Sequence, residues 1–215
     1  MSATRNLLDM LAEAAVEPLA DGITRLPGFV GAADLAGPLQ GVIAAAPLRH
    51  MRTPGGQVMS VAMTNCGAFG WISDRRGYRY SPVDPDSGKP WPDMPASFQQ
   101  LATAAAEAAG FSGFAPDVCL INRYEPGTRL SLHQDRDERD FDQPIVSVSL
   151  GLPATFLIGG LERRGPTCQV RLFDGDVIVF GGPARLIYHG IKPIEDGEHP
   201  LLGACRINLT FRKAN

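Results

Sequence analysis

The sequence predicts an α+β protein that is mainly β, a sandwich or jelly roll with helices packed outside it. From residue 118 onward, short segments of alternating apolar and polar residues recur, separated by turns rich in Gly, Pro and Asp. Short strands at such spacing are typical of these folds. The stretch before residue 118 contains the segments with helical periodicity, so the helices precede most of the strands. The strands predicted here are 118–124, 130–133, 145–150, 155–158, 168–173, 177–180, 186–188 and 206–212.

In the first half of the chain, residues 95–109 carry the strongest helix signal. A proline begins the segment, its apolar residues share one helical face, and Gly110 follows its last turn. Proline at the start and glycine after the end are the usual helix boundaries. The other elements predicted in this half are helices at 5–15 and 32–46 and strands at 22–26 and 58–65.

Residues 67–95 form the longest irregular stretch, about 28 residues in which aromatic residues and arginines lie among Gly, Pro and Asp. A loop of this length in a small domain favours a binding lid over a plain connection. Aromatic rings stack on bases and guanidinium groups meet phosphates, so the composition suits single-stranded nucleic acid. The alternative is a loop that its aromatic residues attach to the core.

The composition predicts an ordinary globular domain with no broad basic surface. The 215 residues include 44% hydrophobic and 20% charged residues, enough for one domain with its own core. The net charge is −3 and the pI about 5.8, which excludes the general positive field of a non-specific duplex-binding protein. Any contact with nucleic acid is therefore expected to be local.

The chain shows no targeting or membrane signal. Asp9 and Glu13 interrupt the apolar residues of the N-terminus, so it is not expected to be a signal peptide. No apolar run approaches the roughly 20 residues that cross a bilayer. The four cysteines are scattered without a C-x-x-C pair, which argues against a zinc knuckle or a disulfide framework. We predict a cytoplasmic protein that does not contact membranes.

A candidate metal site begins at His133 and Asp135, where an apolar strand enters a charged loop. Side chains two residues apart on an extended backbone point to the same side, so both can reach one ion. His189 lies 56 residues further along the chain and supplies a third ligand. Two histidines and one carboxylate form the facial triad of non-haem Fe(II) oxygenases. Taken alone, the His-x-Asp triplet has an alternative interpretation without a metal, in which the loop aspartate caps a histidine at the end of a strand.

The last predicted strand, 206–212, places its polar residues on one face and its apolar residues on the other. The polar residues are Arg206, Asn208, Thr210 and Arg212. Guanidinium groups bind carboxylates through two parallel hydrogen bonds, so this face can hold a dicarboxylate. A polar stripe that faces solvent is the alternative.

Together these motifs resemble the AlkB family of Fe(II)- and 2-oxoglutarate-dependent dioxygenases, which demethylate damaged nucleic-acid bases. The resemblance extends over most of the chain. Besides the triad and the strand 206–212, it includes three segments: Ser60–Gly67, Asn122–Tyr124 and Pro144–Pro153. One position departs from the family pattern, because Phe180 stands where a tryptophan is expected.

The resemblance implies a double-stranded β-helix (jelly roll) with N-terminal helices and a long nucleotide-recognition lid packed on it. It implies one catalytic domain over residues 1–215. Within it, residues 1–112 would be an N-terminal extension that carries the helices and the lid, and residues 113–215 the jelly-roll core.

The resemblance also implies Fe(II) as cofactor and 2-oxoglutarate and O2 as cosubstrates. The reaction it implies is oxidative demethylation of N-alkylated bases such as N1-methyladenine and N3-methylcytosine, with release of formaldehyde, succinate and CO2. The expected partner is alkylated single-stranded DNA, with RNA and duplex DNA as further candidates, and the protein is expected to act as a monomer.

Site residues carry over position by position. The resemblance implies that His133, Asp135 and His189 hold iron. For 2-oxoglutarate it implies Asn122, Tyr124, Arg206, Asn208 and Arg212, and for the target base Trp71, Tyr78, Asp137 and Arg163. Two alternatives of a different kind remain: a hydroxylase of the same fold that acts on a protein or small molecule, and a non-catalytic jelly-roll binding module.

Overall fold

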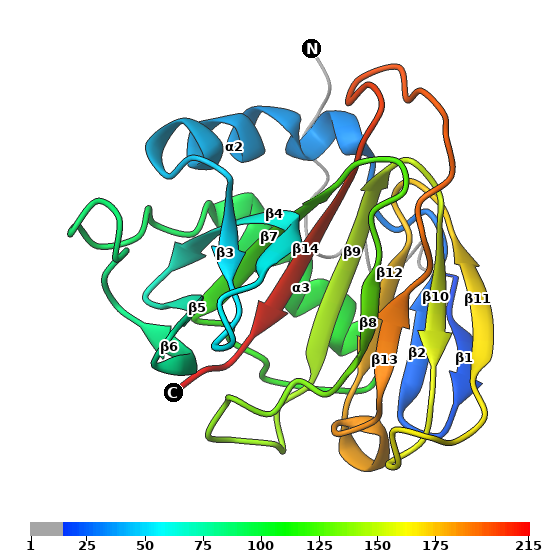
Figure 1. Cartoon of the computed structure of the whole chain (residues 1–215). Coiled ribbons are helices and arrows are strands. Elements are labelled where there is room, and N and C mark those ends of the chain that lie inside the picture. The colour runs from blue at the N-terminus through cyan, green and yellow to red at the C-terminus, as the bar shows by residue number, and fades with distance from the viewer. Residues whose placement is uncertain (1–14) are drawn as a thin grey trace.

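The structure is a computed structural model that describes residues 15–215, and its two main sheets face each other (Figure 1). In the described part of the chain the larger sheet has the order β1-β2-β12-β9-β14-β7-β4-β3, and the smaller has the order β11-β10-β13-β8. All neighbouring strands of both sheets pair antiparallel, as in a jelly roll. The larger sheet comprises β1 (Glu17–Ala20), β2 (Ile23–Leu26), β3 (Arg49–Arg52), β4 (Val58–Gly67), β7 (Val118–Tyr124), β9 (Ile145–Gly151), β12 (Val177–Phe180) and β14 (Arg206–Arg212). The smaller comprises β8 (Leu130–His133), β10 (Ala154–Ile158), β11 (Cys168–Leu172) and β13 (His189–Ile191).

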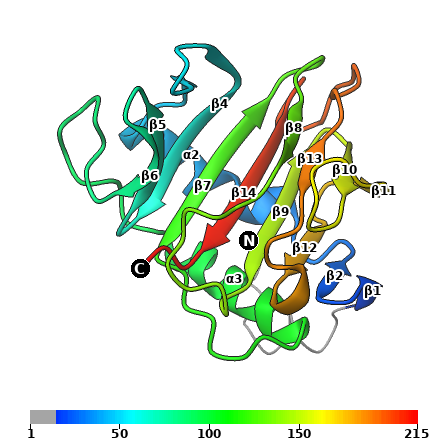
Figure 2. The ribbon, with the colours of Figure 1, turned by 60° about the horizontal axis from the view of Figure 1, so that its bottom comes forward.

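Helices α2 (Ala32–Ala45) and α3 (Ala96–Ala108) cover one face of the larger sheet, and the smaller sheet lies over the other face (Figure 2). One apolar cluster joins the helices to the sheet, through residues such as Leu39, Phe98 and Phe211. A second cluster fills the space between the two sheets, through residues such as Phe156 and Phe180. The prediction of helices packed outside a mainly-β fold is therefore confirmed.

Strand β14 lies inside the larger sheet, between β9 and β7, and is buried on both faces. Its apolar residues Ile207, Leu209 and Phe211 pack into the helix-side cluster. The alternating polar residues therefore face the smaller sheet. They are buried as well, so the interpretation of these residues as a solvent-facing stripe is wrong.

Most predicted strands and helices are confirmed, with ends that shift by one or two residues. The strand predicted at 186–188 is wrong. A short 3-10 helix (η1, Gly182–Ala184) and an irregular stretch occupy this region, and β13 begins only at His189. The segment 67–95 is less irregular than predicted, because it contains the hairpin of β5 (Gly70–Asp74) and β6 (Gly77–Ser81).

Strands β1 and β3 were not predicted, and the helix predicted at 5–15 falls almost wholly outside the described residues. Four strands that precede residue 112, β1 to β4, are part of the same sheet as strands from the jelly-roll half. The division at residue 112 stays a prediction. None of the helices in residues 15–215 is both long and apolar enough to cross a membrane.

Candidate metal and cosubstrate site

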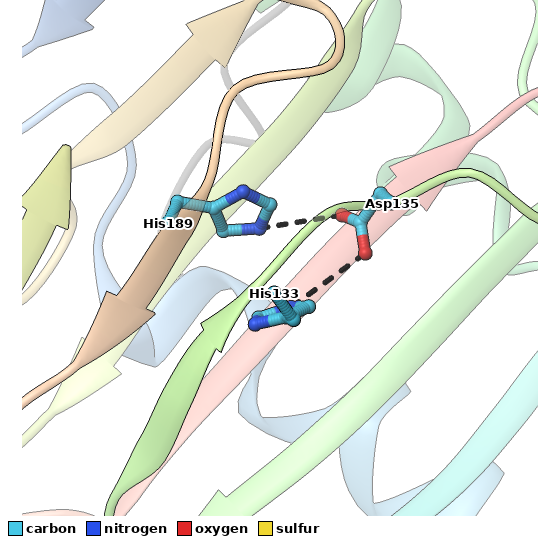
Figure 3. A group of neighbouring side chains, drawn as sticks. All are labelled: His133, Asp135 and His189. Atoms are coloured by element: carbon cyan, nitrogen blue, oxygen red, sulfur yellow. Dashed lines mark ion pairs between the residues drawn. The ribbon is translucent and has the colours of Figure 1, made fainter. Parts of the chain in front are cut away.

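His133, Asp135 and His189 come together between the two sheets, at the ends of β8 and β13 (Figure 3). One ligand atom of each residue lies within 4.8 Å of the others. His133 Nε2 lies 3.7 Å from Asp135 Oδ1, and His189 Nε2 lies 3.5 Å from Asp135 Oδ2. The pairing of β8 with β13 places His133 directly opposite His189, so the sheet register itself brings the two imidazoles together.

The hydrogen bonds of the two imidazoles fix which nitrogen faces the cluster. Nδ1 of His133 contacts the Ser131 carbonyl oxygen at 2.9 Å, and Nδ1 of His189 contacts the Ile187 carbonyl oxygen at 3.2 Å. A carbonyl only accepts, so each Nδ1 carries the proton and each Nε2 presents its lone pair to the cluster. Hydrogen bonds from the ring nitrogen that does not face the metal orient the histidine ligands of metal ions.

Burial and neighbouring charges hold His133 and Asp135 in the protonation states that a metal ion needs. Burial and the nearby His189 lower the pKa of His133 to about 4, which keeps its imidazole neutral near pH 7. Burial alone would raise the pKa of Asp135. The Arg212 guanidinium and the two histidines outweigh burial, so the net pKa of Asp135 lies well below its ordinary value. A neutral imidazole and a carboxylate are ready to bind a divalent ion.

A buried arginine with free donors lies beside this cluster. Arg206 is 1% exposed, its Nη2 donates to Ser149 Oγ at 3.0 Å, and its guanidinium lies 5.0 Å from the Tyr124 ring centroid. Nε and Nη1 of Arg206 find no hydrogen-bond partner among residues 15–215. A buried guanidinium with unsatisfied donors is costly unless a ligand completes it, and a carboxylate fits these donors.

Arg212 lies at the other end of the same strand face and contacts the cluster directly. Its Nη2 donates to Asp135 Oδ2 at 2.8 Å, while its Nε has no partner in the described part of the chain. Between the two arginines lie two amides, Asn208 and Asn122, which face each other across β14 and β7. The site therefore presents two buried cationic groups, separated by amides, to a ligand with a carboxylate at each end.

These residues line a cavity of about 560 Å³. All twelve residues predicted for metal, cosubstrate and base line this cavity: Trp71, Tyr78, Asn122, Tyr124, His133, Asp135, Asp137, Arg163, His189, Arg206, Asn208 and Arg212. The structure thus brings together every residue that the sequence singled out, although they come from six strands and two loops.

Trp71 and Tyr78 form an aromatic wall on this cavity. Their rings are stacked, with centroids 5.5 Å apart and an interplanar angle of 13°. Trp71 Nε1 donates to Asp137 Oδ2 at 2.7 Å, which ties the hairpin β5–β6 to the loop after Asp135. Tyr78 is 47% exposed, so its ring is available to a flat ligand. Phe180 lies deeper, with its ring centroid 5.0 Å from that of His189.

Three residues around this site were missed at the level of sequence. Tyr80 Oη donates to Glu138 Oε1 at 2.5 Å, and Glu138 Oε2 forms an ion pair with Arg185 Nη2 at 3.1 Å. Glu138 follows the His-x-Asp motif closely, which was the one available signal. Tyr80 lies in the segment 67–95 and Arg185 four residues before His189, but no pattern distinguishes either from its neighbours.

The donor set fits an iron ion and a dicarboxylate. Two neutral imidazoles and one carboxylate leave three coordination positions open, and the unpartnered donors of Arg206 and Arg212 fit carboxylate groups. A jelly roll with this arrangement between its sheets defines the class of non-haem Fe(II) oxygenases.

Comparison with known proteins agrees with this class. The family model of the 2OG-Fe(II) oxygenase superfamily matches residues 22–212. The chain is 56% identical over 212 residues to the alpha-ketoglutarate-dependent dioxygenase AlkB of Escherichia coli (strain K12), covering 97% of this chain and 98% of that protein. It is 43% identical over 108 residues to the DNA N(6)-methyladenine demethylase ALKBH1D of Arabidopsis thaliana, covering 45% of this chain and 24% of that protein. The solved structure of OsALKBH1 superimposes with a TM-score of 0.81 at 29% identity, covering 93% of this chain and all of that one.

The chain therefore belongs to the AlkB family within the 2OG-Fe(II) oxygenase superfamily. It is an Fe(II)- and 2-oxoglutarate-dependent dioxygenase, and the resemblance read from the sequence motifs is confirmed.

Proposed function

We propose that this dioxygenase removes N-methyl groups from bases of single-stranded DNA, with N1-methyladenine and N3-methylcytosine as substrates and formaldehyde, succinate and CO2 as products. The observation that carries the proposal is the stacked Trp71–Tyr78 pair on the wall of the metal-site cavity, with Asp137 beside it. Two parallel rings offer a surface on which a flat base can stack. The demethylase names of relatives point to the same substrate class.

In this proposal separate groups of residues bind the metal, the cosubstrate and the target base. His133, Asp135 and His189 hold Fe(II), which together with 2-oxoglutarate and O2 supplies the oxidant for the methyl C–H bond. Arg206 pairs with the distal carboxylate of 2-oxoglutarate, with Tyr124 and Asn208 beside it. Arg212 and Asn122 lie near the carboxylate end that adjoins the metal.

The substrate residues orient the base and exclude water. The rings of Trp71 and Tyr78 stack on it, the Asp137 carboxylate faces its edge, and Arg163 lines the entrance of the cavity. An N-methyl group reaches the metal only when its base has left the helical stack, since the cavity lies between two sheets.

The first test compares single strands with duplexes. Flipping a base out of a duplex costs a few kcal/mol, and a protein of net charge −3 has no broad basic surface to offset that cost. We expect faster demethylation of a single-stranded N1-methyladenine oligonucleotide than of the same sequence paired, measured by mass spectrometry of the product. Equal rates for both would contradict the single-strand preference, and no turnover of either would contradict the proposed substrate.

A hydroxylase of a protein or small molecule would show a different pattern. It would leave methylated oligonucleotides unchanged, while another compound would stimulate 2-oxoglutarate decarboxylation. A non-catalytic binding module would show no decarboxylation at all. The triad, in which Asp135 and His189 are buried, and the two buried arginines favour catalysis over binding alone.

A second prediction concerns charge on the target base. Methylation at N1 of adenine or N3 of cytosine gives the ring a positive charge, which the Asp137 carboxylate attracts. We expect Asp137→Asn, which keeps an acceptor for the Trp71 indole, to lower activity on these two lesions about two- to fivefold more than on neutral N3-methylthymine, because exposed charge pairs contribute about 0.5 to 1 kcal/mol. The ratio of kcat/KM values on the lesions is the measurement.

Trp71→Phe is the matched control for this experiment. Trp71→Phe removes the indole N–H that donates a hydrogen bond to Asp137 but leaves the Asp137 carboxylate in place. We expect it to lower activity on cationic and neutral lesions by similar factors. If Asp137→Asn also lowers both by similar factors, the electrostatic part of the proposal is wrong.

We also propose that the protein acts as a monomer in the cytoplasm. One chain supplies every group that the site requires, so no partner subunit is needed to complete it. In the described structure the four cysteines are free thiols, as in a reducing compartment. Light scattering of the purified protein tests the oligomeric state.

A further inference from the structure

A buried network connects the Asp135 carboxylate with the hairpin β5–β6. Its first link is Arg212, which donates through Nη2 to Asp135 Oδ2 at 2.8 Å and through Nη1 to the Tyr80 hydroxyl at 3.1 Å. Tyr80 lies on β6, directly opposite Trp71 on β5. One guanidinium therefore touches both a proposed metal ligand and the strand that pairs with the base-stacking tryptophan.

Glu138 closes this network. Its side chain is fully buried, and its Oε1 accepts from the Tyr80 hydroxyl at 2.5 Å and lies 3.5 Å from Arg212 Nη1. The Tyr80 hydroxyl thus accepts from Arg212 and donates to Glu138 at the same time. Burial raises the pKa of Tyr80, so this hydroxyl keeps its proton and its role as a donor.

A second arginine attaches the same acid to the backbone of Asp135. Arg185 is 3% exposed, and its Nη2 forms an ion pair with Glu138 Oε2 at 3.1 Å. Its Nη1 donates to the Asp135 carbonyl oxygen at 2.8 Å. Asp135 is therefore held twice, at its side chain by Arg212 and at its backbone by Arg185.

The charges of this network balance. Asp135 and Glu138 supply two carboxylates, and Arg212 and Arg185 supply two guanidiniums, all buried. Buried charges of this kind are stable only when each is paired, and loss of one partner leaves the others to rearrange. Nη1 of Arg212 contacts both the Tyr80 hydroxyl and Glu138, and without these two groups only the contact with Asp135 would fix the guanidinium.

We propose that Tyr80 and Glu138 are positioning residues, which hold Arg212 and, through both arginines, hold Asp135 in the orientation that metal and cosubstrate need. The inference rests on the roles proposed above for Asp135 and Arg212. Neither Tyr80 nor Glu138 lines the cavity, so they act through other residues rather than on the substrate.

The test is an anaerobic titration of the Fe(II)-loaded protein with 2-oxoglutarate, followed by the weak visible charge-transfer band. Tyr80→Phe keeps the ring and removes only the hydroxyl. We expect it to raise the Kd for 2-oxoglutarate on the order of tenfold and to shift the band, since hydrogen bonds to charged groups are strong. Glu138→Gln keeps a hydrogen-bond acceptor and removes the charge. It should also raise the Kd for 2-oxoglutarate and shift the band.

Ser73→Ala is the matched control. Ser73 lies on the same hairpin, and its buried hydroxyl donates to the Arg52 carbonyl oxygen at 2.7 Å, outside the network. We expect Ser73→Ala to leave the Kd for 2-oxoglutarate and the charge-transfer band unchanged. Thermal unfolding reports the stability of each variant. A wild-type Kd and band in Tyr80→Phe would overturn the proposal and leave the network a purely structural role.

If Glu138→Gln does not fold, the Tyr80→Phe titration decides the matter alone. No oligonucleotide enters this experiment. A failure of the demethylase proposal would appear as absent turnover by the wild-type protein, whereas a failure of the positioning proposal would appear only in the titration.

Discussion

Alanine at His133, at Asp135 or at His189 is expected to abolish demethylation. Each residue supplies one of the three ligands that converge within 4.8 Å, and two ligands do not hold Fe(II) with the geometry that the reaction needs. The measurements are turnover of an N1-methyladenine oligonucleotide and bound iron after desalting. A variant that kept wild-type turnover would contradict the assignment of that ligand.

The three variants should differ in stability. His133 is partly exposed, its Nδ1 bonds the backbone two residues away and its Nε2 lies 3.7 Å from Asp135, so His133→Ala should unfold near the wild-type temperature. Asp135→Ala should unfold at a lower temperature, because it leaves Arg212 buried without its closest carboxylate. Asp135→Asn keeps the side-chain volume and a hydrogen-bond acceptor, so it is a better probe of metal binding than Asp135→Ala. His50→Ala, at an exposed histidine outside the site, is the control expected to keep full activity.

Strand β14 could be predicted because its apolar residues alternate strictly with polar ones. In β14 the apolar residues face the helices, so the period of two was visible in the sequence. What the pattern could not decide was the environment of the polar face. The same alternation fits solvent or a buried site, and only the position of β14 between two other strands, with a second sheet over it, shows that Arg206 and Arg212 are buried.

The two wrong predictions have local causes. Residues 186–188 are apolar and lie between glycines, so they suggest a strand, but Tyr188 instead bonds to the backbone of Gly159 and Gly160. The hairpin β5–β6 was hidden because Gly, Ser and Asp, which carry turn signals, lie among its aromatic residues. Cross-strand pairing, and the stacking of Trp71 on Tyr78, stabilises it.

The metal ligands and the two arginines of strand 206–212 could be named from the residue pattern, and Asn122 and Tyr124 through the resemblance to the AlkB family. The network of Tyr80, Glu138 and Arg185 could not. Its members come from three separate segments, and each residue type is common on protein surfaces. Only the fold shows that these side chains are buried together beside Asp135.

Arg206→Met is expected to weaken 2-oxoglutarate binding while it leaves the unliganded protein stable. Arg206 is almost fully buried, and two of its donors have no partner among the described residues. Burial lowers the pKa of Arg206, which reflects the cost of this charge without a ligand. An apolar side chain of similar volume removes that cost, so the unfolding temperature without ligands should stay the same or rise.

Loss of the charge-assisted pair with the distal carboxylate should cost about 1.5 to 3 kcal/mol, or roughly a ten- to hundredfold higher Kd for 2-oxoglutarate. The increase in unfolding temperature that 2-oxoglutarate gives the wild-type protein should therefore largely disappear in the variant. Arg171→Met is the control, because Arg171 pairs with Glu195 on the surface and its loss should change neither quantity. Oligonucleotide affinity should stay near the wild-type value in both variants. If Arg206→Met instead weakens oligonucleotide and 2-oxoglutarate binding by the same factor, Arg206 supports the fold of the whole site rather than the cosubstrate carboxylate.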